Sequence, residues 1–345
     1  LPLSLLWICV LLGRPVTAGE SPLGAVYHGR DASQWAGDLG SADFATRWYA
    51  AYALGQMGSK AGDAVPALER VLANLDEDEY VRGGAAWALG RLGPKAGAAV
   101  PRLTQTLASK HVSVRRNAAQ ALGWLLAEQP TISGPKAREG QGGAPRHQPD
   151  EASRRAITGL LKLLNDEETA VRVSAAVALW RIQRHPRAIP AVEALLRDAN
   201  GSTAYRAAEA LGELGPEAEP AVPSLVAALA HRDEDTRRAA AQSLGRIGAA
   251  AIPALRTVLD GNQERLKLPA VEALGWIGPA AIDALVAALK DSSPPVRRSA
   301  ARALGRLGPA AIRAEPALVK AVSDPTPEVR DAAAAALKSV RPTGS

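Results

Sequence analysis

The chain has 345 residues but only one cysteine, one methionine and one phenylalanine, and aromatic residues make up only 4% of it. The cysteine, Cys9, lies in an apolar run at the start of the chain. If this run is removed by processing, the mature chain has no thiol, which excludes disulfide bonds and thiolate metal sites. No stretch shows the alternation of apolar and polar residues that is typical of a half-buried β-strand. We therefore expect an all-α protein.

Catalytic motifs are missing as well. The sequence has no glycine-rich phosphate loop, no zinc-ligand spacing and no nucleophile elbow. None of the five histidines precedes a glutamate, because the residues that follow them are Gly29, Val112, Gln148, Pro186 and Arg232. We therefore expect no catalytic residue, no metal site and no cofactor.

A repeat dominates what is present. The leucine of the phrase Ala-Leu-Gly, or a close variant, recurs at steps of 35, 33, 57, 32, 33, 30, 30 and 33 residues. A period of this size is typical of an α-solenoid, in which helix pairs stack to bury a continuous core. Counting each short helix with the leucine helix that follows it predicts about nine stacked pairs. The repeated leucines are Leu54, Leu89, Leu122, Leu179, Leu211, Leu244, Leu274, Leu304 and Leu337.

One repeat illustrates the physical logic. Val296, Ala300 and Leu304 are four residues apart and lie on one face of a helix. The pair Gly308-Pro309 ends this helix, because glycine tolerates a left-handed cap and proline cannot continue the hydrogen-bond ladder. A second helix begins near a proline, a residue that suits the first helical turn. The prolines in this position are Pro66, Pro101, Pro190, Pro223, Pro253 and Pro316.

The consensus "VR..AA.ALG.LGP.A...P.L...L.D", present in Val81 to Leu107 and in Val296 to Asp324, resembles the HEAT-repeat superfamily. The closest resemblance is to its short repeats of the phycobilisome bilin lyase type. The resemblance implies a right-handed superhelix of the armadillo type over residues 31–340, with partners bound on a concave face. It also implies that arginines seven residues before the repeat leucines form a structural ladder with acids of the turns. These arginines include Arg47, Arg82, Arg115, Arg172, Arg237, Arg297 and Arg330.

Two other functions remain open from the resemblance. One is an enzyme of the bilin lyase or deoxyhypusine hydroxylase type, since residues 47–58 resemble a motif of the hydroxylases. Trp48 and Tyr49 stand where that motif needs its His-Glu pair, so the iron site does not carry over. The other is a nucleic-acid-binding solenoid similar to the HEAT-like DNA glycosylases.

The first residues predict export. An apolar run from Leu1 to Leu12 precedes the small-residue sequence Val16-Thr17-Ala18, which is typical of a signal-peptidase site. The run is shorter than the roughly 20 apolar residues that a membrane span needs. We therefore expect a signal peptide over residues 1–18 and a mature chain in the periplasm, in the cell envelope or outside the cell.

Other segments depart from the repeat. Residues 19–30 are predicted to be a linker, and residues 341–345 a disordered tail. Residues 129–150 are rich in Gly, Pro and Gln, which predicts a flexible insertion loop and explains the step of 57 residues. Asp31 is expected to cap the first short helix, and Trp35 to cover the open end of the core.

The predicted binding surface lies on the concave face, two residues before or after the repeat leucines and on adjoining turns. The same positions carry Glu209 and Glu213 in the middle of the chain and Trp276 near its end. Tryptophan and arginine often dominate binding energy, but they also pad cores or form solvated faces, and both interpretations are open. The predicted groove has an aromatic end and a basic end, formed by Trp48, Tyr52, Trp87 and Trp124 and by Arg246, Arg298, Arg302 and Arg306.

The charge distribution favours a basic C-terminal third. The whole chain carries a net charge of +6, and residues 231–345 contain 17 Lys and Arg against 12 Asp and Glu, a difference of +5. Such a region can attract an acidic protein, a polyanionic glycan or nucleic acid, although it also serves solubility. A protein is the expected partner, an acidic macromolecule is the second candidate, and nucleic acid is the least favoured.

Overall fold

The computed structural model describes residues 26–127, 150–198 and 200–341. The predicted signal peptide, residues 19–25 of the predicted linker, residues 129–149 of the predicted loop and the last four residues lie outside these ranges. The chain divides into two compact units, unit 1 (Leu1–Leu160) and unit 2 (Leu161–Ser345).

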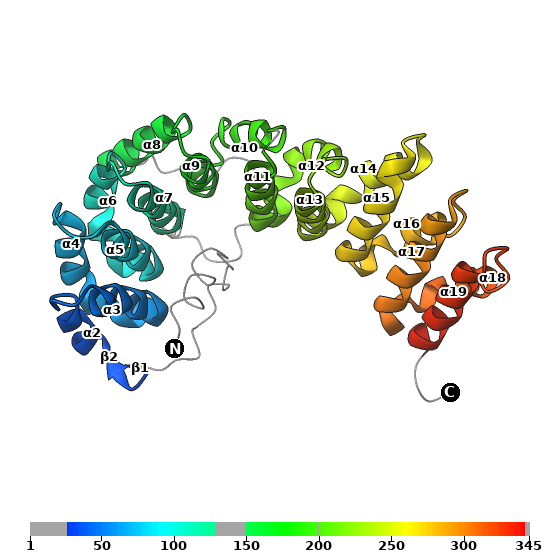
Figure 1. Ribbon diagram of the computed structural model, residues 1–345, viewed down its shortest axis with the longest axis horizontal. Helices are drawn as coiled ribbons and strands as arrows, with labels where there is room; N and C mark the ends of the chain where they lie inside the picture. The colour runs from blue at the N-terminus through cyan, green and yellow to red at the C-terminus, as the bar shows by residue number, and fades with distance from the viewer. Residues whose placement is uncertain (1–25, 128–149, 199, 342–345) are drawn as a thin grey trace, which may run out of the picture. The chain divides into compact units, whose positions relative to one another are not determined.

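Unit 1 begins with a two-stranded antiparallel hairpin, β1 (Val26–Tyr27) and β2 (Arg30–Asp31). The longer helices α3, α5 and α7 pack side by side, and Figure 1 shows them on the inner side of the curve of this unit. The shorter helices α2, α4 and α6 form the outer layer. The helix α8 crosses the boundary of unit 1 at Leu160. The helices are α2 (Ala32–Asp38), α3 (Phe44–Met57), α4 (Val65–Ala73), α5 (Glu79–Arg91), α6 (Val100–Thr106), α7 (Val112–Ala127) and α8 (Glu151–Leu163).

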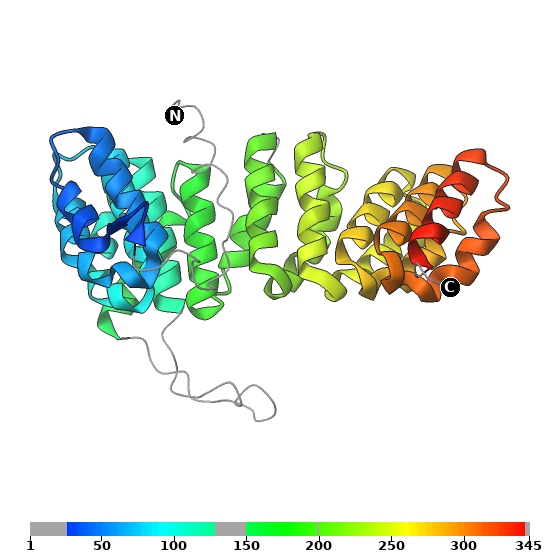
Figure 2. The same ribbon diagram turned by 90° about the horizontal axis from the view of Figure 1, so that it is seen from below.

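Unit 2 repeats the same two-layer arrangement. Its second helices α11, α13, α15, α17 and α19 pack in sequence, and Figures 1 and 2 show the helices of each layer lying alongside one another. The helices are α9 (Thr169–Gln183), α10 (Ala188–Leu196), α11 (Gly201–Leu214), α12 (Val222–Ala228), α13 (Glu234–Ile247), α14 (Ile252–Asp260), α15 (Glu264–Ile277), α16 (Ile282–Ala288), α17 (Pro294–Arg306), α18 (Glu315–Ala321) and α19 (Pro327–Val340). The predicted all-α solenoid is confirmed, and the described ranges contain the helices α2 to α19 in chain order.

The helix ends follow the predicted glycine and proline logic. Gly93, Gly215 and Gly308 have φ values of 64°, 59° and 56°, which lie in the left-handed region that favours glycine. Each begins a short 3₁₀ segment, and these segments span Gly93–Ala99, Gly215–Ala221 and Gly308–Ala314. Proline then occupies the first turn of the following helices α6, α12 and α18. The chain therefore reverses direction compactly between the two helices of a pair.

The prediction that the chain has no strand is wrong at the start of unit 1. Residues 26–30, part of the predicted linker, form most of the hairpin, and its turn places His28 and Gly29 at φ values of 49° and 76°. Strands of two residues are too short to show an alternating pattern, so no periodicity in the sequence predicts them. The hairpin matters because it holds the first turn of the solenoid.

The predicted cap of this end is confirmed. The Asp31 carboxylate accepts a hydrogen bond from the Gln34 backbone N–H at 2.9 Å, and the Gln34 side chain accepts one from the Asp31 N–H at 3.0 Å. This reciprocal pair is a capping box. Trp35 is only 5% exposed, its indole N–H donates to the Tyr27 carbonyl at 3.1 Å, and the Arg30 guanidinium lies 4.2 Å from its ring centre. The tryptophan thus closes the core as expected.

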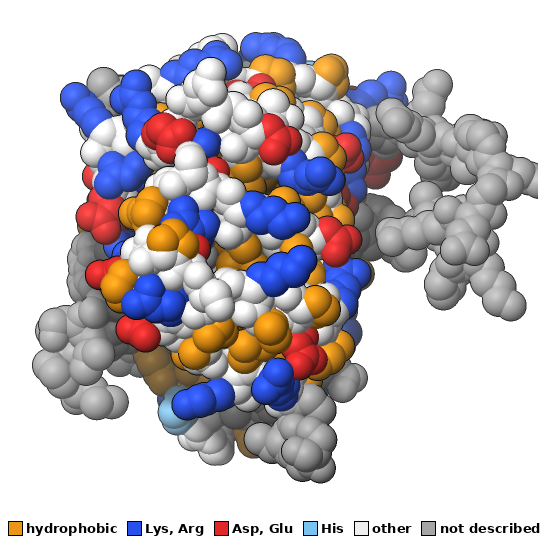
Figure 3. All heavy atoms as spheres, turned by 90° about the vertical axis from the view of Figure 1, so that its right-hand side faces the viewer, with side chains coloured by type: hydrophobic (Ala, Val, Ile, Leu, Met, Phe, Trp, Pro, Cys, Tyr) orange, Lys and Arg blue, Asp and Glu red, His pale blue; other side chains and the backbone are white. Residues whose placement is uncertain are grey.

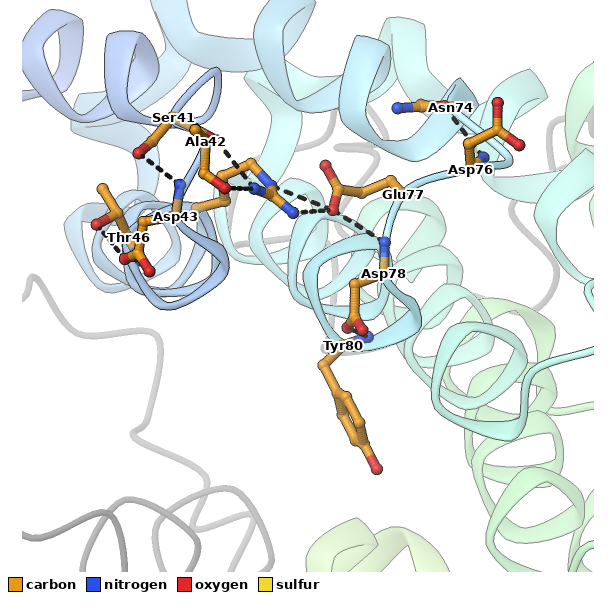
Figure 4. A network of polar contacts seen from close by, with 10 residues as sticks. Ser41, Ala42, Asp43, Thr46, Asn74, Asp76, Glu77, Asp78 and Tyr80 are labelled. Atoms are coloured by element: carbon orange, nitrogen blue, oxygen red, sulfur yellow. Dashed lines mark hydrogen bonds and ion pairs between the residues drawn. The ribbon is translucent and has the colours of Figure 1, made fainter.

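The predicted arginine ladder is confirmed at Arg47 and Arg297, whereas Arg237 and Arg330 donate only to carbonyl oxygens of their own turns within the described ranges. In unit 1, Arg47 donates to the carbonyl oxygens of Ser41 and Ala42, both at 2.9 Å, and reaches Glu77 of the next turn at 2.9 Å (Figure 4). In unit 2, Arg297 donates to the carbonyl of Asp291 at 2.9 Å and forms two hydrogen bonds, of 2.7 and 2.9 Å, with Asp324. Each arginine satisfies carbonyls of the turn before its own helix, and its ion pair joins that turn to the next one.

Alanine and leucine build the core. The repeat leucines Leu54, Leu89 and Leu122 are completely buried, as are the alanines before them. Alanine favours helix and lets neighbouring helices approach closely. No helix within the described ranges has the length and apolar character that a membrane crossing requires.

Candidate partner-binding surfaces

The aromatic row of unit 1 consists of Trp48, Tyr52, Trp87 and Trp124. The rings of Trp48 and Tyr52 are stacked, with centres 5.8 Å apart and planes 8° apart. Tyr52 stacks in the same way on Trp87 of the next helix, at 5.7 Å and 7°. Three nearly parallel rings therefore connect α3 with α5. All four side chains are half-buried, so the row keeps part of its surface in solvent.

The glycine of the repeat phrase makes room for this row. A β-carbon at Gly55 would lie 2.2 Å from the ring of Trp87, and one at Gly90 would lie 2.7 Å from the ring of Trp124. Each tryptophan therefore packs directly against the backbone of the preceding leucine helix. The Arg91 guanidinium lies 6.0 Å from the ring centre of Trp124 and extends the row with a cation.

These aromatic side chains serve both interpretations that the sequence left open. Their packing on Gly55 and Gly90 is structural, because it fills the space between neighbouring helices. Their remaining exposed surface is available to a partner, and stacked rings form a rigid surface that loses little conformational entropy on binding. The structure therefore brings the predicted aromatic residues together on α3, α5 and α7.

In unit 2 the structure brings together three of the four predicted arginines. Arg298, Arg302 and Arg306 follow one face of α17 and line an open hollow between α17 and α19. Arg246 lies on α13 and does not line it. The hollow also contains two carboxylates that the sequence interpretation missed, Glu328 and Asp331 of α19. It is therefore a surface of mixed charge rather than a purely basic one.

Acidic and phenolic groups lie on α11, earlier in unit 2. Burial raises the pKa of Tyr205 to about 12, and the hydrogen bond of its hydroxyl group with Glu209 adds to the rise. Tyr205 thus remains a neutral hydrogen-bond donor at neutral pH. The charge of the leucine-helix face changes along unit 2, from Glu209 on α11 to Arg246 on α13 and Arg306 on α17.

Trp276 of α15 was left out of the predicted site, although it occupies the same repeat position as Trp124. Its side chain is 60% exposed. Its position two residues after the repeat leucine Leu274 is the sequence feature that predicts it as a surface residue of the same kind as Trp124. The aromatic and basic ends of the predicted groove belong to separate units, and a single groove that joins them remains a prediction.

Comparison with known proteins identifies the family of the chain. A family model of HEAT repeats matches residues 38–123, 157–230, 193–275, 222–291 and 282–344. The chain belongs to the HEAT-repeat family. The bilin lyase type of HEAT repeat is compatible with this match and remains a prediction. No curated protein is matched by this HEAT-repeat chain.

Solved structures share the fold of this HEAT-repeat chain at low sequence identity. Kap95p, from a structure in which its binding induces the switch loops of RanGDP to adopt the GTP-bound conformation, gives a TM-score of 0.52 at 16% identity, covering 90% of this chain and 44% of that one. Importin beta, crystallised in an ammonium sulfate condition, gives 0.51 at 16% identity, with 90% and 45% covered. Kap121p bound to the extreme C-terminus of the phosphatase Cdc14p gives 0.50 at 14% identity, with 90% and 37% covered.

These identities show the fold alone. The HEAT-repeat chain spans less than half of the length of each of these three solved chains, since 37% to 45% of them is covered. Their partners are therefore not assigned to it by this likeness.

Proposed function

We propose that the protein is a non-catalytic HEAT-repeat scaffold that binds a protein partner, and that the aromatic row of unit 1 is the principal contact. The observation that carries the proposal is the near-parallel stack of Trp48, Tyr52 and Trp87, which connects two helices and remains partly open to solvent. A function that needed only packing would favour rings buried on both faces.

The physical gain from such a contact is large for its size. Removing apolar surface from water stabilises a complex by about 25 cal/mol per Å². Aromatic side chains have few rotatable bonds, so little side-chain entropy is lost when they are covered. Tryptophan and tyrosine are accordingly enriched among the residues that dominate binding energy.

Solved structures with this fold support a protein partner as the class. The Kap95p structure concerns its binding to RanGDP, and the Kap121p structure contains the extreme C-terminus of the phosphatase Cdc14p. An acidic macromolecule is the second candidate, because the last third of the chain is basic. The mixed charge of the hollow between α17 and α19 favours an acidic protein over a uniform polyanion.

The decisive experiment is capture of partners from native extract by the wild type and by the double variant Trp87→Ala/Trp124→Ala. We expect the variant to lose the proteins that the wild type retains, with unchanged helical content by circular dichroism. Phe44→Ala is the matched control, because Phe44 lies on α3, is 44% exposed and lies outside the row.

Two results would overturn the proposal. Equal capture by the double variant would remove the aromatic row from the binding surface. Stoichiometric iron or a bound chromophore in the purified native protein would favour the enzyme alternative instead.

We also propose that the protein is exported and that residues 1–18 are removed. The support is the apolar run before Val16-Thr17-Ala18. Intact-mass measurement on fractionated native cells tests this proposal: a mature chain beginning at Gly19 outside the cytoplasm is expected. An uncleaved chain in the cytoplasm would contradict it.

A further inference from the structure

Trp276 is the one tryptophan in the described ranges whose side chain is mostly exposed, at 60%. The Cβ atom of Trp276 packs on the preceding leucine helix: a β-carbon at Gly245 would lie only 2.4 Å from it. The backbone position is therefore set by the repeat, while the indole ring projects into solvent. Tryptophan is enriched among the residues that dominate binding energy, so this ring is a candidate contact.

Two arginines flank Trp276 on the neighbouring helices. Arg246 of α13 and Arg306 of α17 occupy the same repeat position, and α15 packs between these two helices. A β-carbon at Gly275 would lie 2.8 Å from Nη2 of Arg306, which places that guanidinium beside the residue preceding Trp276. An exposed ring and a guanidinium are thus adjacent on one surface.

Three of the four arginines of α17 have no ion-pair partner among the described residues. No described residue forms an ion pair or a side-chain hydrogen bond with Arg298, Arg302 or Arg306, whereas Arg297 on the same helix binds Asp324 through two hydrogen bonds. Three like charges spaced four residues apart repel each other along a helix, so they do not stabilise it. Figure 3, which views the C-terminal end of unit 2, shows Lys and Arg side chains interspersed with apolar and acidic ones.

The hollow between α17 and α19 is lined by small residues, and acidic residues lie toward one end of it. Gly305, Ala335 and Ala336 line it, which leaves room for a peptide backbone. Glu328 and Asp331 lie in the first half of α19, and Arg302 and Arg306 lie in the second half of α17. Because these two second helices are equivalent elements of adjacent repeats, the acids and the two arginines lie toward opposite ends of the hollow.

We propose that Trp276, Arg302 and Arg306 form a docking surface for an acidic peptide segment that carries one large apolar side chain. The apolar side chain packs on Trp276, and carboxylates pair with the two guanidiniums, which bind such groups with two parallel hydrogen bonds. Glu328 and Asp331 repel negative charge at the other end, so the segment lies with its acidic residues toward the end of α17. A uniformly charged polyanion, such as nucleic acid, would be repelled by these two carboxylates.

This surface goes beyond the function proposed for the aromatic row, because it lies in the other unit and takes a ligand of different chemistry. Its test needs no natural partner. The probe is a fluorescein-labelled peptide with a phenylalanine between two pairs of glutamates, titrated against the full chain and followed by fluorescence anisotropy. A matched peptide with lysines in place of the glutamates and a single-stranded oligothymidine are the comparison probes.

We expect saturable binding of the acidic peptide and none of the lysine peptide. The variant Arg302→Glu/Arg306→Glu should weaken binding about 10-fold or more, and Trp276→Ala about 5-fold, because each removes one of the proposed contacts with the peptide. Raising the salt concentration should weaken binding of the wild type. The control Arg256→Glu, an exposed arginine of the other layer on α14, should retain wild-type binding.

Circular dichroism checks that each variant keeps its helices. The variant Arg302→Lys/Arg306→Lys keeps both positive charges and should therefore retain part of the affinity for the acidic peptide. The proposal is overturned if the wild type does not bind the acidic peptide, or if Arg256→Glu weakens binding as much as the double variant. Equal or tighter binding of oligothymidine would overturn it in favour of nucleic acid. Any of these results leaves capture through Trp87 and Trp124 to be judged separately.

Discussion

Trp124 in unit 1 and Trp276 in unit 2 occupy the same repeat position but have different surroundings. Each follows a repeat leucine by two residues and packs against a glycine of the preceding leucine helix, Gly90 or Gly245. Trp124 is half-buried beside Arg91, whereas Trp276 is 60% exposed. The repeat therefore determines the position of the Cα and Cβ atoms of the tryptophan. The neighbouring side chains determine how much of its ring is exposed to solvent.

A related contrast holds between two glycines of the repeat phrase, Gly90, which Trp124 covers, and Gly275, which Arg306 covers. In unit 1, a β-carbon at Gly90 would lie 2.7 Å from the Cα of Ala121, which belongs to the backbone of the next helix. In unit 2, a β-carbon at Gly275 would first meet the end of the Arg306 side chain, at 2.8 Å. Backbone in a packed layer cannot move cheaply, while an exposed arginine can adopt another rotamer. Close packing therefore constrains the first site more strongly than the second.

The largest effect is expected from alanine at these two glycines. Gly90→Ala should lower the free energy of unfolding by about 2 kcal/mol, because overpacking forces backbone shifts. Gly275→Ala should change it by less than about 1 kcal/mol, since the gain in helix propensity offsets a movable contact. Urea unfolding followed by circular dichroism measures both. Gly37→Ala in α2, where a β-carbon meets no atom within 4 Å, is the control. Equal losses at Gly90 and Gly275 would refute the contrast.

Removing the two tryptophans is expected to cause a loss of the same order at Trp124 and a smaller one at Trp276. Trp124→Ala should cost about 2 kcal/mol of stability, because it uncovers Gly90 and removes half-buried apolar surface. Trp276→Ala should cost less than about 0.5 kcal/mol, as for most exposed substitutions. Thermal unfolding of the two variants checks this. If Trp276→Ala destabilises the chain as much as Trp124→Ala, Trp276 is a packing residue and its exposure has been misinterpreted.

The smallest effect concerns the ladder, which both units share. The hydrogen bonds from Arg297 hold the pKa of Asp324 below its usual range. A carboxyl group with a lowered folded-state pKa stabilises the fold above its unfolded pKa of about 3.9, and this stabilisation is lost as the pH falls through the folded value. We therefore expect the melting temperature to fall in acid, and to fall less steeply for Asp324→Asn.

Arg297→Ala should remove the same part of the acid dependence, because it removes the partner that lowers the pKa. Neither ladder variant should weaken binding of the acidic peptide at neutral pH while the chain remains folded. An unchanged acid profile in both variants would show that this ion pair does not couple protonation to folding.

Local sequence patterns predicted much of the fold. The spacing of Leu54, Leu89 and Leu122 predicted the repeat, and Gly308-Pro309 predicted a helix end, since both depend on residues close in the chain. The cap at Asp31 and the cover by Trp35 follow from the same kind of reasoning. The ladder through Arg47 and Arg297 came from the family resemblance, which carries knowledge of how adjacent repeats meet.

Contacts between repeats were less predictable. The stacking of Tyr52 on Trp87 and the packing of Trp87 on Gly55 depend on the offset between adjacent helices, which no single repeat specifies. Glu328 and Asp331 were missed beside the arginines because they lie on the next leucine helix, outside the aligned positions. Trp276 stood in an aligned column, yet its exposure depended on the side chains around it.

The sequence by itself determined the helix pairs, their ends and the small-residue core, because hydrophobic periodicity, glycine, proline and alanine act over one or two helical turns. Only the tertiary structure decided which side chains of successive repeats meet. It joined Trp48, Tyr52 and Trp87 into one stack and left Arg302 and Arg306 without an ion pair among the described residues. The physical reason is that burial and ion pairing are set by the distance between neighbouring helices, and that distance results from the packing of the whole layer.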